Sequence, residues 1–331
     1  MDYSFTPKDL SAIYRRKIEN WALSSAEESE KIPRGERVAR GKASVRVWTL
    51  EQLPAIGKQF GWLKCAAAPI SICITMPKAS VLKSTIAFNL SRALAINGQK
   101  VLAIGLDKTG GVSDSLNLDQ LQTLKDDAKT IGLHSALKEG ASLEKLVKHT
   151  NLPTLNFIPE TSQLFLIESL TEVEISERLS HLLENAKQTY DVVVFDTSSS
   201  LTALDKSAIR LADHILVPLG CDLRSYRASD FGVRQLSEAL SKGGNQSKSV
   251  TYVPTLKQQT RLSLEIEANY RLSYPTQTLG HSIRVNEDSE EGANQLSVFE
   301  AEPTLPIAED YFHVISQFWS RVIETTKSPP G

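Results

Sequence analysis

Short apolar runs alternate with amphipathic stretches along most of this chain. Six runs rich in Ile, Val and Leu predict buried strands, because strands covered on both faces carry apolar side chains throughout. These runs occupy residues 70–75, 101–106, 155–158, 192–195, 215–218 and 250–253. Helical periodicity predicts helices at residues 85–97, 172–187, 226–241 and 308–325. This alternation predicts a doubly wound α/β fold: a mostly parallel sheet between two layers of helices, with its binding site at the carboxyl ends of the strands.

The N-terminal part of the chain lacks this alternation. Residues 14–21 predict the start of a helix. Residues 24–46 are rich in charged and small side chains and predict a flexible or weakly ordered link. Residues 45–54 then predict a strand that enters a helix capped by Thr49, which resembles the opening of a winged or helix-turn-helix unit.

Two parts of the chain are therefore expected: a partly helical N-terminal extension at residues 1–68 and a main domain at residues 69–331. The extension is either the remnant of a helix-turn-helix unit that binds DNA, or a segment that dimerises or packs on the main domain. The residue pattern does not separate these alternatives.

Composition and charge narrow the classes of function. The 331 residues are 41% hydrophobic and 23% charged, which is ordinary for a globular protein with a sizeable core. Lysine and arginine total 37 against 39 acidic residues, so the net charge of −2 excludes a strongly basic nucleic-acid coat but allows a local basic patch. Cys65, Cys73 and Cys221 form no CxxC pair, which argues against a disulfide framework or a zinc site. The first residues do not resemble a signal peptide and no apolar stretch has bilayer length, so we expect a cytoplasmic protein.

The loop between the first strand and helix of the main domain carries the candidate chemistry. It places Lys83 and Ser84 at a helix N-terminus just after a buried strand. Backbone N–H groups and the helix dipole attract a phosphate there, a lysine adds positive charge, and a serine hydroxyl can bind Mg²⁺. The glycines usual in such loops are absent, and a left-handed conformation at Leu82 costs about 1–2 kcal/mol. The alternative is a lysine at a helix N-terminus that an acidic neighbour holds.

Residues 78–85, with the sequence KASVLKST, resemble the deviant Walker A box of the ParA/MinD family, KGGxxK[ST][ST]. Lys78 matches the family's additional lysine, and Ala79 and Ser80 stand where the box has two glycines. Leu82 stands where many members have a third glycine.

Other segments resemble the same family in the expected order. Asp107 matches the second aspartate of the family's IDxDPQG segment, in which Gly105 replaces the first. Asp196 ends a strand that is similar to the Walker B segment, and residues 212–218 resemble the AD-x-x-LVP strand. The resemblance covers about residues 69–326.

The resemblance implies a P-loop site for ATP and Mg²⁺. The implied nucleotide-binding residues are Lys78, Ala79, Ser80, Val81, Leu82, Lys83, Ser84 and Thr85. Ser84 and Asp196 are the implied Mg²⁺ residues, and Lys78 and Asp107 the implied catalytic residues. Lys78 would reach the partner subunit's nucleotide in a dimer, and Asp107 would orient the attacking water or sense the γ-phosphate. Lys108 could instead pair with Asp107 and occupy its carboxylate.

The function that the resemblance implies is DNA partitioning, the segregation of plasmids or chromosomes. Such an ATPase forms a homodimer on nucleotide binding, contacts non-specific DNA and responds to a ParB-like partner, in the cytoplasm at the nucleoid and without membrane binding. Arg261, Arg271 and Arg284 are the candidate DNA contacts. Two alternatives stay open: a nucleotide-independent DNA-binding or scaffold protein with a degraded phosphate loop, and a regulator of the division site.

Overall fold

Each central strand of the main domain sends its side chains into two different hydrophobic cores. In β4 (Ile70–Ile74), Ile72 lies in one core and Cys73 in the other. In β8 (Val192–Asp196), Val194 and Phe195 divide in the same way. Strands that are buried on both faces have to lie inside a sheet with helices on either side.

A seven-stranded sheet with this property forms the centre of the computed structural model, which describes all residues except 1–2, 41–42, 117–130, 242–247, 286–294 and 328–331. Its strand order is β10-β9-β4-β8-β5-β7-β6, and β6 is antiparallel to β7 while the other neighbours are parallel. The further strands are β5 (Val101–Gly105), β6 (Lys148–His149), β7 (Leu155–Ile158), β9 (His214–Gly220) and β10 (Ser249–Thr255). The doubly wound, mostly parallel α/β fold is thereby confirmed.

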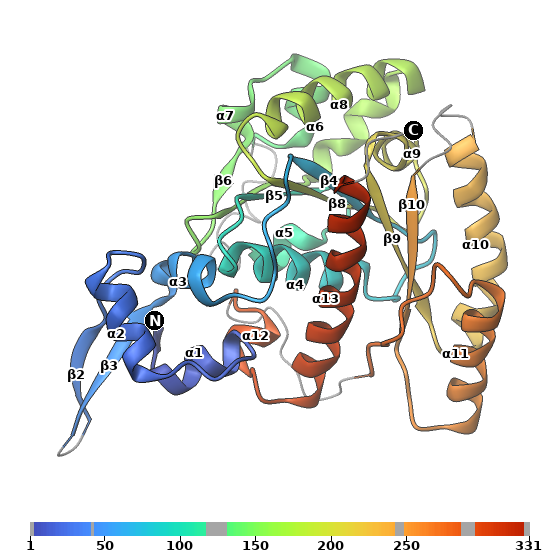
Figure 1. Ribbon diagram of the computed structural model, residues 1–331. Helices are drawn as coiled ribbons and strands as arrows, with labels where there is room; N and C mark the ends of the chain where they lie inside the picture. The colour runs from blue at the N-terminus through green and yellow to red at the C-terminus, as the bar shows by residue number, and fades with distance from the viewer. Residues whose placement is uncertain (1–2, 41–42, 117–130, 242–247, 286–294, 328–331) are drawn as a thin grey trace.

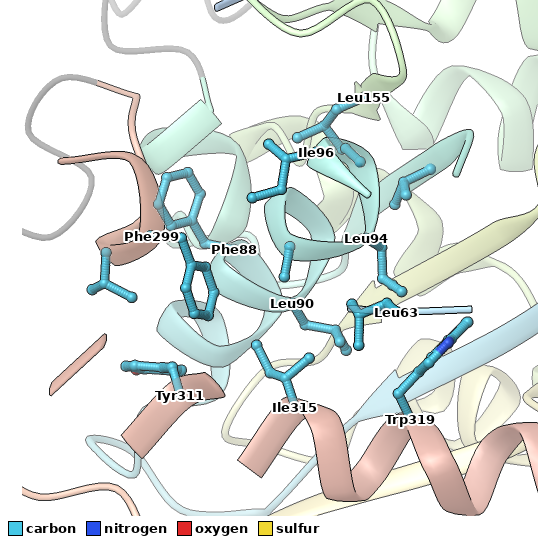
Figure 2. Packing of buried hydrophobic residues seen from close by; sticks show 14 of the residues in the cluster. Leu63, Phe88, Leu90, Leu94, Ile96, Leu155, Phe299, Tyr311, Ile315 and Trp319 are labelled. Atoms are coloured by element: carbon cyan, nitrogen blue, oxygen red, sulfur yellow. The ribbon is translucent and has the colours of Figure 1, made fainter. Parts of the chain in front are cut away.

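Helices cover both faces of this sheet (Figure 1). On one face, α4 (Lys83–Ile96) packs with α12 (Val298–Ala301) and α13 (Pro306–Lys327). Figure 2 shows this core, with Phe88, Leu90, Leu94 and Ile96 of α4 near Phe299, Tyr311, Ile315 and Trp319. The helices with buried side chains in the second core include α8 (Glu172–Lys187), α9 (Ala203–Leu211) and α10 (Leu223–Ser241).

The helix bounds agree with the sequence pattern to within a turn. α8 has the predicted bounds, whereas α4, α10 and α13 begin two or three residues earlier than predicted. For α4 the additional residues are Lys83 and Ser84, so the candidate phosphate-binding lysine is the first residue of the helix. Further elements of the main domain are α5 (Val112–Leu116), α6 (Leu133–Glu139), α7 (Leu143–Leu146), η5 (Ser162–Ser169) and α11 (Arg261–Ser273). Within the described part of the chain, no helix has the length and apolar character needed to cross a membrane.

The N-terminal extension is folded, and the prediction of a flexible link at residues 24–46 is wrong. A helix does begin within residues 14–21, but only at Asn20, and residues 24–46 contain the end of that helix and most of a β-hairpin. One pair of charged side chains helps to hold this segment, since Arg46 forms an ion pair with Glu27 at 2.6 Å and stacks on the ring of Trp48. The elements are β1 (Ser4–Phe5), α1 (Pro7–Ile13), α2 (Asn20–Glu28), β2 (Glu36–Arg40), β3 (Ala43–Thr49), η1 (Leu50–Gln52) and α3 (Leu53–Phe60).

This extension packs tightly on the main domain. The strands β1, β3 and β2 form a small antiparallel sheet, from which the β2–β3 hairpin projects away from the main domain (Figure 1). A Cβ atom on Gly57 in α3 would lie 1.8 Å from the carbonyl oxygen of Ile96 in α4, so only glycine allows this approach. The side-chain amide oxygen of Asn97 accepts hydrogen bonds from the backbone of Trp62 and Leu63, at 2.7 and 3.1 Å. The extension and α4 therefore form one continuous core.

Candidate functional site

The loop between β4 and α4 takes a strained backbone without glycine. Ser80 has φ of 59° and Leu82 has φ of 68°, so both lie in the left-handed region that glycine favours. Ala79, the other residue at a family glycine position, is not among the residues of positive φ. The loop therefore keeps a sharply turned path that its sequence does not favour.

Packing around the loop holds this strained path. Val81 is buried, and its carbonyl oxygen accepts a hydrogen bond from Thr255 Oγ1 of β10 at 3.4 Å. Leu82 is partly buried and contacts the core around α4. These contacts offset a conformational cost of about 1–2 kcal/mol for each left-handed residue.

Lys83 points back into the loop that precedes it. Its ammonium group donates a hydrogen bond to the carbonyl oxygen of Lys78 at 2.9 Å, and the side chain is buried. Burial lowers the pKa of Lys83, while the nearby carboxylates of Asp196 and Asp107 oppose this effect. A buried cation at a helix N-terminus is suited to bind an anion.

Asp196 at the end of β8 is buried and only half satisfied. Its Oδ2 accepts a hydrogen bond from Val112 N at 2.9 Å, whereas its Oδ1 has no partner among the described residues. Burial raises the pKa of Asp196 to about 6, and a hydrogen bond with Ser84 opposes the rise. An unpartnered buried carboxylate oxygen beside a serine hydroxyl fits a Mg²⁺ site, because Mg²⁺ prefers oxygen ligands of this kind.

The two predicted catalytic residues both make contacts within their own loops. Lys78 is half-buried, and its ammonium group donates to the carbonyl oxygen of Ala79 at 2.9 Å. Asp107 accepts hydrogen bonds from Thr109 N at 3.0 Å and from Thr109 Oγ1 at 2.6 Å. Lys108 pairs with Glu168 at 3.2 Å and not with Asp107. Beside Asp107 lies a cavity of about 350 Å³, lined by the β5–α5 loop, the β8–α9 loop and η5.

The three arginines predicted to contact DNA lie in the C-terminal third of the chain. Arg261 is almost fully exposed and pairs with Glu265 one turn along α11. Arg271 pairs with Glu267 at 2.6 Å. Arg284 forms two hydrogen bonds with the carboxylate of Asp310, at 2.6 and 2.7 Å. Each guanidinium group therefore already has an acidic partner.

Glu160, directly after β7, is a site residue that the sequence analysis missed. Ser113 Oγ of α5 donates a short hydrogen bond to it. Desolvation raises the pKa of Glu160 to about 8, with the Ser113 hydrogen bond opposing and the nearby Asp196 and Asp114 adding to the rise. Its only sequence signal was the place of a glutamate shortly after a predicted strand.

A family model described as an AAA domain (AAA_31) matches residues 70–249, just over half of the chain. The chain belongs to the ParA/Soj-like partitioning ATPase family. This range includes the β4–α4 loop, Asp107, Glu160 and Asp196, so the candidate site lies in the part that defines the family.

The partitioning ATPase relatives resemble this chain over about half of its length. It is 31% identical over 153 residues to the sporulation initiation inhibitor protein Soj of Bacillus subtilis, covering 46% of this chain and 58% of that protein. It is 29% identical over 171 residues to the chromosome partitioning protein ParA of Myxococcus xanthus, covering 51% and 57%. The chain thus spans somewhat more than half the length of these curated relatives.

Two solved structures with bound nucleotide share the fold. A putative plasmid partition protein from Borrelia burgdorferi, bound to AMPPNP, matches with a TM-score of 0.64 at 20% identity, over 77% of this chain and 99% of that chain. A variant of McdA from Cyanothece in complex with ATP matches with a TM-score of 0.63 at 17% identity, over 80% and 99%. These likenesses extend the family's fold to most of the chain.

Proposed function

We propose that this chain is a Mg²⁺-dependent ATPase that partitions DNA and dimerises when it binds ATP. The observation that carries the proposal is the left-handed backbone of the β4–α4 loop at Ser80 and Leu82. A loop without the preferred glycines keeps such a path only where the surrounding structure enforces it, and strain of this kind gathers at functional sites. The AMPPNP and ATP complexes of proteins with this fold support the same assignment.

Nucleotide phosphates would bind above the first turn of α4. The N–H groups of that turn and the helix dipole favour an anion there. Lys83 is buried and has a neutral carbonyl group as its hydrogen-bond partner, so exchanging that partner for a phosphate oxygen would strengthen the interaction. Ser80 is exposed at the mouth of the loop, where its N–H would face the nucleotide.

Mg²⁺ fits the space between Ser84 and Asp196. When bound, the ion would neutralise negative charge on the phosphates during phosphoryl transfer. Ser84 would supply its hydroxyl oxygen, and Asp196 would supply the Oδ1 atom that is unpartnered in the described structure. Asp107 would exchange its hydrogen bonds with Thr109 for one with a water molecule, which it would orient. The Lys78 side chain would turn away from its own loop to reach the partner subunit's nucleotide.

DNA contact would be electrostatic and non-specific. Arg261 is the most exposed of the three candidate arginines, and its exposed ion pair with Glu265 contributes little stability, so it can exchange that partner for a phosphate group. Affinity that depends on such contacts falls as the salt concentration rises. A ParB-like partner, a nucleoid location in the cytoplasm and the absence of membrane binding belong to the same proposal.

The N-terminal extension would give this protein a second DNA contact. Two short helices followed by a β-hairpin are the parts of a winged helix, in which a helix and the hairpin both approach DNA. Arg34 and Arg37 are exposed at the start of the hairpin, which projects from the body of the molecule (Figure 1). Charge reversal of both residues should weaken DNA binding and reduce its salt dependence; unchanged binding would favour the dimerising or packing role of the extension.

A nucleotide-independent DNA-binding or scaffold protein is the second candidate. The observation that favours it is the closed state of the catalytic side chains, because Asp107 caps its own turn and Lys78 folds back on its own loop. In that case the family fold would serve only to present surfaces to DNA or a partner.

The test is a titration with a fluorescent ATP analogue in the presence of Mg²⁺. The native chain is compared with an Ala79→Gly/Ser80→Gly double variant and with Lys83→Ala. We expect the native chain to bind the nucleotide. Lys83→Ala should bind it on the order of 100-fold more weakly, because the negative charge of the phosphates loses its buried positive partner. Binding by the double variant alone would show a disabled native site, and the scaffold function would take its place. ATP-dependent dimerisation, measured by light scattering in the same samples, tests the switch.

A further inference from the structure

Glu160 occupies the place where a side chain at residue 105 would point. Glu160 follows β7, and Gly105 ends the neighbouring parallel strand β5. A Cβ atom added at Gly105 would lie 1.7 Å from Glu160 Oε2 and 2.3 Å from Glu160 Cδ. Even alanine at residue 105 would overlap this carboxyl group. Any side chain at residue 105 therefore excludes the observed placement of the Glu160 side chain.

The same carboxyl group binds the first turn of α5. Ser113 Oγ donates its short hydrogen bond to Glu160 Oε2, and Ser113 N points at Glu160 Oε1 from 3.4 Å. The preceding residue, Val112, donates its N–H to Asp196 Oδ2 at 2.9 Å. Two carboxyl groups from different strands therefore bind consecutive residues of one turn, directly after the loop that carries Asp107.

Glu160 also borders the space assigned to Mg²⁺. A Cβ atom on Gly111 would lie 2.6 Å from Asp196 Oδ2, 3.2 Å from Glu160 Oε1 and 3.4 Å from Ser84 Oγ. All three side chains thus meet around the bare α-carbon of Gly111. Desolvation in this crowded place raises the pKa of Glu160, and the negative charge of the nearby Asp196 adds to the rise.

We propose that Glu160 is a positioning residue of the nucleotide site, which replaces a side chain at residue 105 and fixes the start of α5 against Asp196. Through α5 it sets the position of the loop that carries Asp107. The effect on Mg²⁺ and nucleotide rests on the proposed function, whereas the hold on α5 does not.

Amide hydrogen exchange of residues 107–116 tests the hold on α5. We expect Glu160→Ala to raise exchange in this segment by about tenfold, the effect of losing one buried hydrogen bond to a carboxyl group. Glu160→Gln should keep the native protection, since glutamine still accepts from Ser113. Glu168→Gln is the matched control, because Glu168 is exposed and pairs with Lys108 of the same loop. Native protection in Glu160→Ala would overturn the proposal.

A double-mutant cycle tests whether the Glu160 carboxyl group takes the place of a side chain at residue 105. Gly105→Asp alone should lower Tm by several degrees because its Cβ overlaps Glu160. The Gly105→Asp/Glu160→Ala variant should recover most of the loss and restore protection of residues 107–116, since the new carboxylate enters the freed space. Additive losses in Tm would overturn the proposal, and this cycle decides even where Glu160→Ala alone folds poorly.

Nucleotide titration with and without Mg²⁺ separates this inference from the proposed function. Glu160→Ala should reduce the gain in affinity due to Mg²⁺ by about tenfold and leave the affinity without Mg²⁺ unchanged. A native chain with no nucleotide affinity would refute the proposed function, and the exchange and Tm results would still decide the role of Glu160. If the native chain binds nucleotide and the Glu160→Ala variant gains as much affinity from Mg²⁺ as the native chain does, the positioning role at this site is overturned.

Discussion

Two neighbouring loops at the carboxyl end of the sheet depart from the family pattern in different ways. In the β4–α4 loop, Ser80 and Leu82 stand where the motif resemblance places glycines, and both adopt left-handed conformations. At the end of β5, Gly105 replaces an aspartate, and the carboxyl group of Glu160 from the next strand lies in its place. A backbone path survives the loss of its preferred residue where neighbours hold it. A missing carboxyl group has to be supplied by another residue.

The first prediction compares the two aspartates of the site and has the largest expected effect. Asp196→Ala should lower the affinity for Mg²⁺ and nucleotide by about 10–100-fold, because it removes the unpartnered oxygen beside Ser84. Asp107→Ala should keep binding and lose hydrolysis. Nucleotide titration and phosphate release measure these effects, and equal losses of affinity in both variants would contradict the assignment of Mg²⁺ to Asp196.

A substitution at Gly105 should have the next largest effect, now on stability. Gly105→Ala should lower the free energy of unfolding by about 1–3 kcal/mol, because its Cβ atom overlaps Glu160. Gly280→Ala is a suitable control, since a Cβ atom at residue 280 would lie 3.4 Å from its nearest neighbour, which belongs to a flexible glutamine side chain. Urea denaturation measures both. A Gly105→Ala variant as stable as the control would mean that Glu160 moves aside freely.

In the phosphate loop, a substitution that relieves backbone strain should raise stability, the opposite of the effect at Gly105. Ser80→Gly should raise the free energy of unfolding by up to about 1 kcal/mol, because glycine adopts φ of 59° without strain. Ala79→Gly should lower it slightly, because Ala79 has no positive φ to relieve and glycine adds freedom to the unfolded chain. Loss of stability in both variants would show that side-chain contacts of Ser80 outweigh its strain.

The fold of the main domain could be predicted because its strands are apolar on both faces. Runs such as residues 70–75 and 192–195 carry that signal locally, and the helix at residues 172–187 has the predicted bounds. In the N-terminal hairpin, the strand β3 was predicted from residue 45 on, but the strand β2 could not be predicted in this way. β2 (Glu36–Arg40) projects into solvent, so it carries charged side chains without the alternation that a buried face imposes.

The candidate site was predictable only where its signals are local in sequence. A lysine and a serine after a buried strand pointed to the phosphate loop, whose residue roles remain predictions. Glu160 had no such signal. Its importance comes from a contact with Gly105, 55 residues earlier, and with Ser113, so it needs the pairing of β5 with β7 to become visible.

The pH dependence of stability gives the most specific test of the contrast between the two loops. Burial raises the pKa of Glu160 from the ordinary 4.5 to about 8, so between these values the folded chain holds a proton that the unfolded chain releases. The contribution of Glu160 to stability therefore falls as the pH rises from about 4.5 to about 8. Glu160→Gln carries no such proton, so the Tm of the native chain should fall relative to that variant across this window. Ser80→Gly, which changes only strain, should differ from the native chain by the same amount at every pH. A constant difference for Glu160→Gln would mean that Glu160 is ionised in the folded protein, with its charge balanced by the first turn of α5.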